Sequence, residues 1–585
     1  MRKTKILATL GPACNNVKTM KKMIEKGLDG ARINCSHGTV ESRLEIVNNL
    51  KAARAAAGKH VALLLDTKGP EIRTKTFAND VKSVRLEQGA EFILTTDDIE
   101  GDNTKVAVTH ANLPKEIKVG HRVLIDDGLL EMKVTEIKGS NIKCILVNSG
   151  ELGTRKGVNL PDSKINLPSL TDQDVEDIKF GINEGFDFVA ASFVRTADDI
   201  INIRKVLDDN GGKNIHIIAK IESRDGVNNL DDILEVADGV MVARGDLGVE
   251  IPPEEVPKVQ KSMIFDCNIK GKPVITATHM LESMVSNPRP TRAEANDVAN
   301  AIYDGTDVIM LSGETANGKY PVEAISMMDR IARVSEEDVD YEKLTEKFKN
   351  FSKNVTLVMS QSGVATAREM GATCIVPITD SGFAARMVSR FRPQSTILAI
   401  TSSETVCRQL CLSWGCVPLL AEKPFEGCCG IFDIAEDMAL RSGFARPGEV
   451  IVALAGVPSD AGATNTMRVR TVGDVIATGT GNNSGTVQGV TRLFSKGEND
   501  GRRFFEQGDI IVCTQTDNSM LEYIRKAGGI VVGSWADVDT SHAETVAEAL
   551  GLPLLRVNIR ATEHVKEGTA VTIDSDKGLL FNGYK

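Results

Sequence analysis

Residues 215–222 read Ile-His-Ile-Ile-Ala-Lys-Ile-Glu, an apolar run that ends in a lysine and a glutamate. A continuous apolar run of this length is typical of a buried strand in a parallel sheet. Lys220 and Glu222 are two residues apart, so on a strand they project to the same side. The end of this strand is therefore the first candidate position for chemistry.

Similar apolar runs recur on both sides of this stretch, separated by helical patterns such as Val17 to Glu25. Together with 215–220, the predicted strands are 5–10, 31–34, 61–66, 186–189, 239–242, 273–276 and 307–311. Eight strand–helix units over about 240 residues predict a (β/α)8 TIM barrel. An open doubly wound sheet is the alternative.

The pattern changes between residues 71 and 168, where short segments alternate polar and apolar residues. Examples are 90–94 and 120–125, with turn signals at Asp127-Gly128 and Ser149-Gly150. Alternation with frequent turns is typical of β-hairpins. We therefore expect a small β-barrel domain inserted into the α/β barrel.

Two further regions follow the barrel. Residues from about 354 to 472 again alternate strands and helices, and 479–485, rich in Gly, Asn and Ser, predict a linker. Beyond it, 509–512 and 528–532 are predicted strands. The expected domains are a barrel (1–70 and 169–345), a β insert (71–168), an α/β domain (346–474) and an extra C-terminal domain (475–585).

Composition narrows the class of protein. Of 585 residues, 42% are hydrophobic and 25% are charged, which excludes wholesale disorder, a collagen-like fibre and a membrane bundle. The apolar stretch after the basic residues 1–5 ends at Gly11-Pro12, too short for a signal-peptide core. A net charge of −11 argues against a nucleic-acid partner. Eleven scattered Cys, none with CxxC spacing and two adjacent at 428 and 429, favour reduced thiols. We expect a cytoplasmic protein without a membrane partner.

Polar side chains follow the ends of the predicted strands, where barrel enzymes carry their working residues. They include Arg32, Asn34, Ser36, Asp66, Thr67, Lys68, Arg73, Lys220, Glu222, Arg244, Gly245, Asp246, Thr278 and Ser312. Two carboxylates on neighbouring strands, Glu222 and Asp246, suit Mg²⁺. A divalent ion beside Lys220 suits a phosphorylated or enolate-forming substrate. The amides of 245–248 could bind an anion.

Simpler interpretations exist for single motifs. Lys220 and Glu222 could form a structural ion pair at a strand end. Residues 34–38 could be an ordinary strand-to-helix turn with a capping serine. The case for a site rests on the convergence of all these groups at one barrel rim.

Several long motifs, in order, resemble those of pyruvate kinases. The run 217–226 resembles the active-site signature of that family, and the similarity extends to 65–73, 156–161, 243–248, 290–294 and 310–316. That family transfers a phosphoryl group from phosphoenolpyruvate to ADP, giving pyruvate and ATP at the end of glycolysis. The resemblance implies that Glu222 and Asp246 hold Mg²⁺, or Mn²⁺ in its place. It implies that Lys220 stabilises charge on the phosphoryl group and the enolate oxygen.

The resemblance also assigns binding roles. Arg32 and Arg73 would clamp phosphates, Gly245, Asp246 and Thr278 would bind the substrate carboxylate, and Thr278 with Ser312 would protonate the enolate. Arg73, Lys156, His37 and Pro12 would contact the nucleotide, and Asp127 would be a lid contact.

Asn34, Ser36, Asp66 and Thr67 match the K⁺ ligands of the family. Glu71 stands where K⁺-dependent members have Glu and K⁺-independent members have Lys, because a fixed ammonium can replace the mobile cation. We therefore expect K⁺ dependence. His279 stands where many members have Gln, and we interpret it as a polar replacement rather than a catalytic base.

The third region resembles the regulatory domain of the family, with its phosphate loop at 379–384. Thr379, Ser381 and Gly382, with Ser402 and Ser403 on a nearby loop, are the expected effector ligands. The charge of Asp380 opposes a bisphosphate, so we expect AMP or ribose 5-phosphate. The alternative is an ordinary helix start that binds no effector.

The fourth region resembles the phosphohistidine swivelling domain of phosphoenolpyruvate-utilising enzymes, with Thr540-Ser541-His542-Ala543 at its motif. Asp539 could orient His542 but would repel phosphate, so we expect a structural or regulatory domain. The resemblance implies an allosteric homotetramer. The alternatives are a silent metabolite-binding protein and a phosphotransferase acting through His542.

Overall fold

The computed structural model describes residues 1–348, 354–422, 430–456, 464–483, 485–494, 500–533 and 538–584. The chain divides into two compact units. The first comprises Met1–Val358 and Thr379–Pro424, and the second comprises Met359–Ile378 and Phe425–Lys585. Among the helices of the described ranges, none has the length and apolar character needed to cross a bilayer.

Eight parallel strands form a closed barrel in the first unit, in the order β1-β16-β15-β14-β13-β12-β3-β2. Their bounds are β1 Lys5–Thr9, β2 Gly30–Asn34, β3 Ala62–Asp66, β12 Phe188–Ala191, β13 His216–Ile221, β14 Gly239–Ala243, β15 Val274–Ala277 and β16 Val308–Leu311. Each lies on a predicted apolar run. The barrel prediction is confirmed, and the open doubly wound sheet is wrong.

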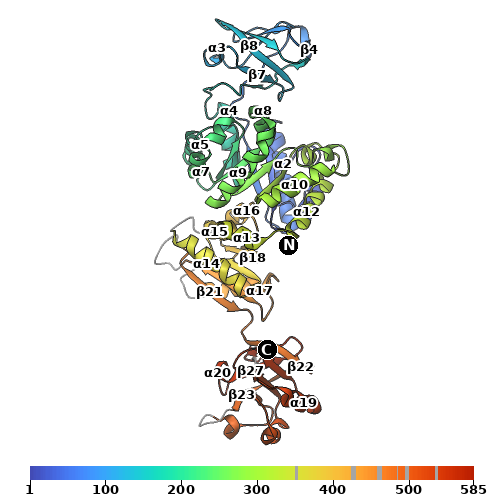
Figure 1. Ribbon diagram of the computed structural model, residues 1–585, viewed down its shortest axis with the longest axis vertical. Helices are drawn as coiled ribbons and strands as arrows, with labels where there is room; N and C mark the ends of the chain where they lie inside the picture. The colour runs from blue at the N-terminus through green and yellow to red at the C-terminus, as the bar shows by residue number, and fades with distance from the viewer. Residues whose placement is uncertain are drawn as a thin grey trace. The chain divides into compact units, whose positions relative to one another are not determined.

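Helices surround the barrel strands (Figure 1). The main ones are α1 Val17–Glu25, α2 Val40–Ala57, α4 Asp172–Glu184, α5 Ala197–Asp209, α7 Leu230–Val236, α9 Val256–Lys270, α10 Arg292–Asp304 and α12 Pro321–Glu337. Thr39, Thr171 and Thr291 begin three of them with capping boxes, which satisfy the first free amides. Short helices follow strand ends: α6 Arg224–Asn228, α8 Arg244–Glu250 and α11 Gly313–Ala316. Residues 341–347 form α13 (Tyr341–Lys347).

The insert consists mainly of strands, as predicted, and its strands form two sheets. A six-stranded sheet has the order β11-β7-β8-β9-β5-β6, and β10 pairs with β4. The bounds are β4 Ser83–Leu86, β5 Glu91–Thr95, β6 Lys105–Ala107, β7 Arg122–Ile125, β8 Leu130–Lys138, β9 Asn141–Leu146, β10 Gly150–Gly153 and β11 Val158–Asn159, with the short helix α3 Leu113–Glu116. The β7–β8 turn places Asp126, Asp127 and Gly128 at φ values of 57°, 54° and 81°. This left-handed backbone turns the hairpin sharply, so its tip carries two carboxylates.

The segment Thr379–Pro424 belongs to the same unit as the barrel. It contains α15 Phe383–Arg390, β18 Thr396–Thr401, α16 Glu404–Leu410 and β19 Cys416–Leu420, with β18 and β19 parallel. Leu412 of this segment packs in the same apolar cluster as Leu7, Leu64 and Ile218 of the barrel strands. The amino-terminal end of the barrel is thereby covered.

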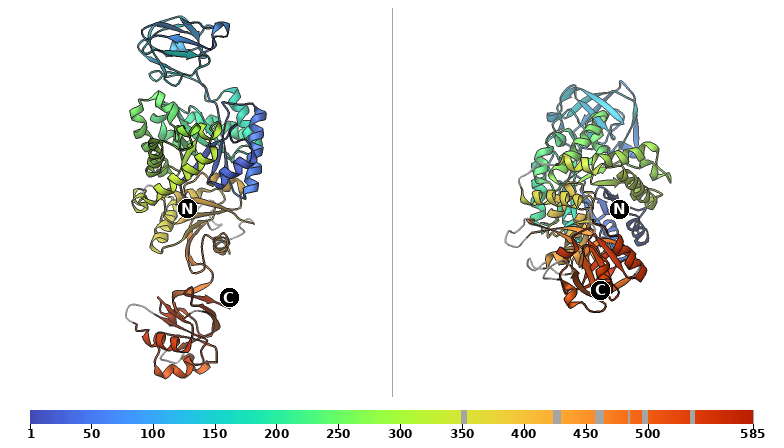
Figure 2. Two further views of the ribbon diagram at one scale, coloured as in Figure 1. Left: turned by 90° about the vertical axis from the view of Figure 1, so that its right-hand side faces the viewer. Right: turned by 60° about the horizontal axis from the view of Figure 1, so that its bottom comes forward.

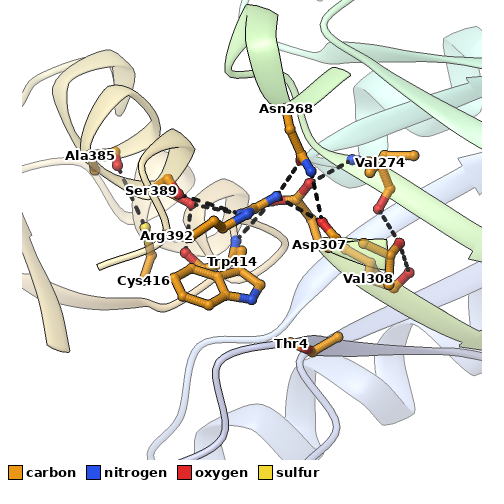
Figure 3. A network of polar contacts seen from close by, with 12 residues as sticks. Thr4, Asn268, Val274, Asp307, Val308, Ala385, Ser389, Arg392, Trp414 and Cys416 are labelled. Carbon is orange, nitrogen blue, oxygen red and sulfur yellow. Dashed lines mark hydrogen bonds and ion pairs between the residues drawn. The ribbon is translucent and has the colours of Figure 1, made fainter. Parts of the chain in front are cut away.

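A buried ion pair joins this segment to the barrel (Figure 3). Arg392 is 2% exposed, and its Nη1 lies 2.9 Å from Asp307 Oδ1, just before β16. Its Nη2 donates to Gly305 O at 3.0 Å and to Asn268 Oδ1. The guanidinium carbon lies 4.9 Å from the ring centroid of Trp414. Each oxygen of Asp307 also accepts a backbone N–H, from Trp414 or Val274. Fixed partners therefore compensate both charges, and Arg392 Nε is the one guanidinium nitrogen without a hydrogen-bond partner among the described residues.

The second unit holds two further groups of elements. The first contains α14 Val355–Glu369, which begins in the first unit, with β17 Cys374–Pro377, α17 Ile431–Arg441, β20 Val450–Ala455 and β21 Thr466–Thr471. The second is a closed barrel, β22-β26-β25-β24-β23-β27-β28 (Figure 2). Its bounds are β22 Val475–Asn482, β23 Thr486–Phe494, β24 Ile510–Cys513, β25 Gly529–Gly533, β26 Leu554–Val557, β27 Ala570–Asp574 and β28 Leu579–Asn582, with α18 Leu521–Ile524, α19 Ser541–Leu550 and α20 Ala561–His564.

The predicted linker at 479–485 is wrong, because β22 covers most of it and pairs with β26 and β28. A Cβ on Gly479 would lie 1.8 Å from Arg556 O, and one on Gly481 would lie 1.8 Å from Ser575 O. These glycines permit close backbone approach, a common reason for glycine inside a strand. Residue 484 and the adjacent cysteines at 428 and 429 lie outside the described residues.

Arg392→Met should destabilise the first unit strongly, because it leaves Asp307 buried without its counter-ion. The expected loss is about 3–5 kcal/mol of unfolding free energy. Denaturant unfolding followed by tryptophan fluorescence in a Trp535→Phe background, where Trp414 is the one remaining tryptophan, would measure it. Lys179→Met is the control, since Lys179 pairs with Glu176 on the exposed surface of α4 and should cost less than about 1 kcal/mol. Equal losses would contradict the prediction.

Candidate active site

Lys220 lies at the centre of the barrel's carboxyl rim. Its Nζ is 2.9 Å from Glu222 Oε1 and 3.2 Å from Asp66 Oδ1, and it donates to Ser192 Oγ at 2.6 Å. These partners come from the ends of β13, β3 and β12. The predicted Lys220–Glu222 ion pair forms, but it is part of a larger group that spans three strands.

Charge compensation decides the ionisation of this group. Burial opposes the charge of Lys220, but the carboxylates of Asp66 and Glu222 outweigh it and raise the pKa of the ammonium. Burial likewise opposes the charge of Asp66, and Arg32 and Lys220 outweigh it and lower the pKa of that carboxyl. Arg32 Nε lies 2.6 Å from Asp66 Oδ2. Lys220 is therefore a fixed cation, and Asp66 is a fixed anion between two cations.

Glu222 and Asp246 are less well compensated. Burial, opposed by Lys220 and reinforced by Asp246, raises the pKa of Glu222 to about 7. Burial also raises the pKa of Asp246, with Lys220 again opposing. Glu222 Oε2 accepts the N–H of Phe193 at 2.5 Å. Two neighbouring carboxylates that share one ammonium favour a further cation.

This donor set fits Mg²⁺, which binds one or two carboxylates and completes its shell with water and substrate oxygens. Within the described ranges, no group of three or more His, Cys, Asp or Glu is arranged to hold a metal ion. Glu222 and Asp246 would therefore bind the ion together with oxygens of the substrate.

A cavity of about 480 Å³ opens beside these carboxylates, between the rim and the insert. It is lined by Glu222, Asp246, Arg73, Lys156 and Asp127, all of which the sequence predicts as site residues, as well as by Glu71, Asp126, Phe193, Arg195 and Arg224. Two of the cations are held by acidic neighbours. Arg73 Nε lies 2.5 Å from Glu71 Oε2, and Lys156 Nζ lies 2.8 Å from Asp126 Oδ1.

Thr278 and Gly245 meet at the ends of β15 and β14. Thr278 Oγ1 accepts the N–H of Gly245 at 2.8 Å and donates to Ala277 O at 2.6 Å. Thr278 has a φ of 68°, unusual for a β-branched residue and a form of strain found at functional sites. Arg244 Nη2 donates to Thr278 O at 2.6 Å and so holds this backbone. His279, with φ 54°, is exposed at the rim.

Other predicted residues lie near the rim but outside the cavity lining. His37, Pro12 and Ser36 are exposed. Ser312 directly follows β16, and its N–H donates to Glu314 Oε2 at 2.7 Å. The interpretation of Ser36 as a helix cap is wrong, because α2 begins later and Thr39 caps it.

The predicted K⁺ ligands lie at and just beyond the ends of two paired strands, β2 and β3. Asn34 and Asp66 are partners in the β2–β3 register. Asn34 Oδ1 accepts the N–H of Ser36 at 3.0 Å, and Thr67 Oγ1 accepts the N–H of Ser192 at 3.2 Å. An amide oxygen, hydroxyls and one already compensated carboxylate fit a monovalent cation.

Sequence reasoning missed Ser192 and Phe193, which directly follow β12. Ser192 Oγ accepts from Lys220 and donates to Thr67 O at 2.7 Å, so it is a positioning residue for the ammonium. Phe193 positions Glu222 through its backbone N–H. The rule that identified the other strand ends could have identified these residues.

The predicted effector loop has a further cation. Arg386 Nη1 donates to Ser381 O at 3.3 Å, next to Gly382, while Asp380 is exposed. Thr379 is buried. Ser403 Oγ accepts the N–H of Val406 at 3.3 Å and so caps α16, and Ser402 precedes it. The loop at Ser402 and Ser403 therefore contains an ordinary helix cap, as the interpretation without an effector expects.

His542 stands at the start of α19 in the second unit. Its Nδ1 lies 2.8 Å from Thr516 Oγ1, and its Nε2 lies 3.2 Å from Asn518 Oδ1. Asp539 instead accepts the N–H of Ser541 at 2.9 Å. Among the described residues, Thr516 and Asn518, distant in sequence, contact the His542 ring in place of Asp539.

A closed parallel barrel with cations and carboxylates at its carboxyl rim defines the class of (β/α)8 barrel enzymes. Residues 1–325 match the model of the pyruvate kinase barrel domain, 358–470 that of the pyruvate kinase alpha/beta domain, and 505–578 that of the mobile domain of PEP-utilising enzymes. The chain therefore belongs to the pyruvate kinase family and is a phosphotransferase, as its motifs predict.

Pyruvate kinases of other bacteria align with this chain over its full length. The chain is 44% identical over 586 residues to pyruvate kinase of Bacillus licheniformis. It is 43% identical over 588 residues to that of Geobacillus stearothermophilus, and 42% identical over 589 residues to that of Staphylococcus aureus strain MRSA252. Each alignment covers 100% of this chain and 99% of the relative.

Ser192→Ala should lower kcat by about 10–100-fold, because a hydrogen bond to a charged group contributes about 1.5–3 kcal/mol. KM for the phosphorylated substrate should change less, since the variant loses only the placement of Lys220. Steady-state kinetics would measure both. Ser335→Ala, on the buried face of α12, is the control and should leave both constants unchanged. A change in KM alone would exclude this positioning role.

Proposed function

We propose that the protein transfers a phosphoryl group from phosphoenolpyruvate to ADP, forming pyruvate and ATP in the last step of glycolysis. The observation that carries this proposal is the placement of Lys220 between Asp66 and Glu222, beside a cavity that Arg73, Lys156 and Asp246 also line. Phosphoryl transfer depends on positioning and charge stabilisation more than on covalent chemistry. A fixed ammonium next to a binding site for a divalent ion meets both needs.

The residues at the carboxyl rim of the barrel would bind the substrate and a divalent ion. Glu222 and Asp246 would hold Mg²⁺, or Mn²⁺, which when bound would neutralise developing phosphoryl charge. Arg32 and Arg73 would bind the phosphate, and the backbone at Gly245 and Asp246, with Thr278, would bind the carboxylate. Lys220 would stabilise negative charge on the transferring phosphoryl group and on the enolate oxygen. Its raised pKa keeps it protonated, so this role needs no proton transfer.

Completion of pyruvate needs a proton on the enolate carbon. Thr278 is the proposed donor end of a relay that includes Ser312. The Thr278 hydroxyl bonds Ala277 O and Gly245 N, which orients it at the rim. His279 is exposed beside it and is not assigned a step.

Nucleotide binding would use the insert. Arg73 and Lys156 are paired with Glu71 and Asp126. The phosphates of ADP would replace these carboxylates as the partners of the two cations. Pro12 and His37 would contact the nucleotide on the barrel side. Asp127, at the hairpin tip, would contact the rim as the insert closes.

Regulation would use the loops at Thr379, Ser381 and Gly382 and at Ser402 and Ser403. We propose AMP or ribose 5-phosphate as the activator, with the phosphate near the guanidinium of Arg386. The active form would be a cytoplasmic homotetramer, and residues 475–585 would serve a structural or regulatory role. Pyruvate formation with each phosphate added separately tests the effector.

Lys220→Met should abolish most of the turnover, because it removes the central cation of the rim without adding bulk. The expected loss in kcat is at least about 10²–10³-fold, the usual effect of deleting one transition-state donor. Pyruvate formation from phosphoenolpyruvate, ADP, Mg²⁺ and K⁺ would measure it. Lys179→Met, on exposed α4, is the matched control. Unchanged turnover in Lys220→Met would exclude the proposed function.

Glu71→Lys should reduce the K⁺ requirement, because Lys is the residue that K⁺-independent relatives carry at this position and its fixed ammonium would replace the mobile cation. Glu71→Gln removes the carboxylate without adding a cation and should remain K⁺-dependent. Turnover with K⁺ replaced by a tetraalkylammonium salt at constant ionic strength distinguishes the two variants. An equal K⁺ requirement in both variants would contradict the charge-replacement argument.

A further inference from the structure

A second, much smaller cavity lies at the opposite end of the barrel, beneath α15. About 10 Å³ in volume, it has room for roughly one water-sized group. Its lining includes Lys272, which follows α9, and Arg386 and Arg390 on α15, together with the Arg392–Asp307 pair. All of these residues belong to the first unit.

The charges around this cavity do not balance. Arg392 is paired with Asp307, the one carboxylate in the lining. Lys272 Nζ donates to the backbone carbonyls of Ala237, at 2.7 Å, and Leu234. Neither Arg386 nor Arg390 lies within 4.0 Å of a carboxylate oxygen of the described residues, so two guanidiniums remain without a counter-ion in contact.

Of the two guanidiniums, Arg390 is the one with buried N–H groups that lack a partner among the described residues. It is 5% exposed, and its Nε and Nη2 are buried without a hydrogen-bond partner among the residues that the structure describes. Its Cδ lies 3.7 Å from the place where a Cβ on Gly271 would be, so the side chain is packed against the loop after α9. A buried guanidinium with free N–H groups is strongly unfavourable unless an anion or water accepts them.

Arg386 adds a second cation one turn earlier on the same helix. Like charges four residues apart on a helix repel each other. The carboxylate of Asp238 attracts Arg386, but its direct partners are other groups. It lies 3.0 Å from Arg204 Nη2 and accepts the N–H of Ile217. Burial lowers the pKa of both Arg386 and Arg390. The local field therefore favours a negative ligand over a neutral one.

We propose that this cavity binds one monatomic anion, chloride, through Nε and Nη2 of Arg390. Arg386 and Lys272 would contribute electrostatic attraction. A bound anion would connect α15 to the barrel loop at 271–272. Because Arg386 also donates to Ser381 O, occupancy would stabilise the loop that precedes α15.

Chlorine NMR tests the site directly on the full-length protein in a chloride-free gluconate buffer. Added chloride should show an excess line width in proportion to protein concentration, because exchange with a bound site broadens the signal. Arg390→Leu should lose most of this excess, and Arg390→Lys should retain part of it. Arg525→Leu, at an exposed arginine, is the control and should retain all of it.

Inorganic phosphate serves as the size control. Phosphate is larger than the cavity, so added phosphate should leave the Arg390-dependent chloride signal unchanged. Chloride binding that depends on Arg390 supports the proposal. An excess line width equal in wild type and Arg390→Leu would overturn it and assign the free N–H groups to water.

A second test needs only the wild type, in case Arg390→Leu does not fold. Crystals soaked in bromide would show the position of a bound anion by anomalous diffraction. An anomalous peak in contact with Arg390 supports the site. Bromide peaks confined to other positions would contradict it. The outcome is independent of turnover, so it does not depend on the proposed reaction.

Discussion

The buried positive charge of Lys220 is the constraint on which the catalytic rim depends. An ammonium that is 9% exposed must be compensated, and Asp66 and Glu222 do so from two different strands. Each carboxylate then needs its own partner. Asp66 has Arg32, whereas Glu222 shares its environment with Asp246 and so favours a metal ion. The side-chain charges of the rim therefore form one coupled set with Lys220 at its centre.

The barrel carries a second buried charge at its other end. Asp307 precedes β16, and Ser312 follows it, so one short strand joins the Arg392 ion pair to the rim. Similarly, Asp187 precedes β12, where Arg408 Nε lies 2.9 Å from its Oδ1, and Ser192 follows that strand. Segment Thr379–Pro424 is thus attached to the same strands that position Lys220 and the proposed proton relay. Two buried ion pairs therefore connect this segment physically to the strands of the site.

Sequence patterns predicted the barrel because each buried strand is a continuous apolar run, and strand ends then identified most of the rim. They failed where the physical cause is a contact between distant residues. Gly479 and Gly481 have a linker's composition, but a neighbouring backbone requires them. Thr516 contacts His542 across 26 positions, so no local motif reveals it. Ser192 was missed because the predicted strand ended at residue 189, whereas β12 ends at Ala191.

The pairing of β22 has a practical consequence for dividing the chain. This strand bonds to β26 along one part and to β28 along another, so it closes the C-terminal barrel. A cut placed in the Gly-rich segment would remove that strand and expose the edges of its two partners, which favours aggregation. A shortened enzyme, or an isolated C-terminal domain, should instead be divided before Val475, where the strand begins.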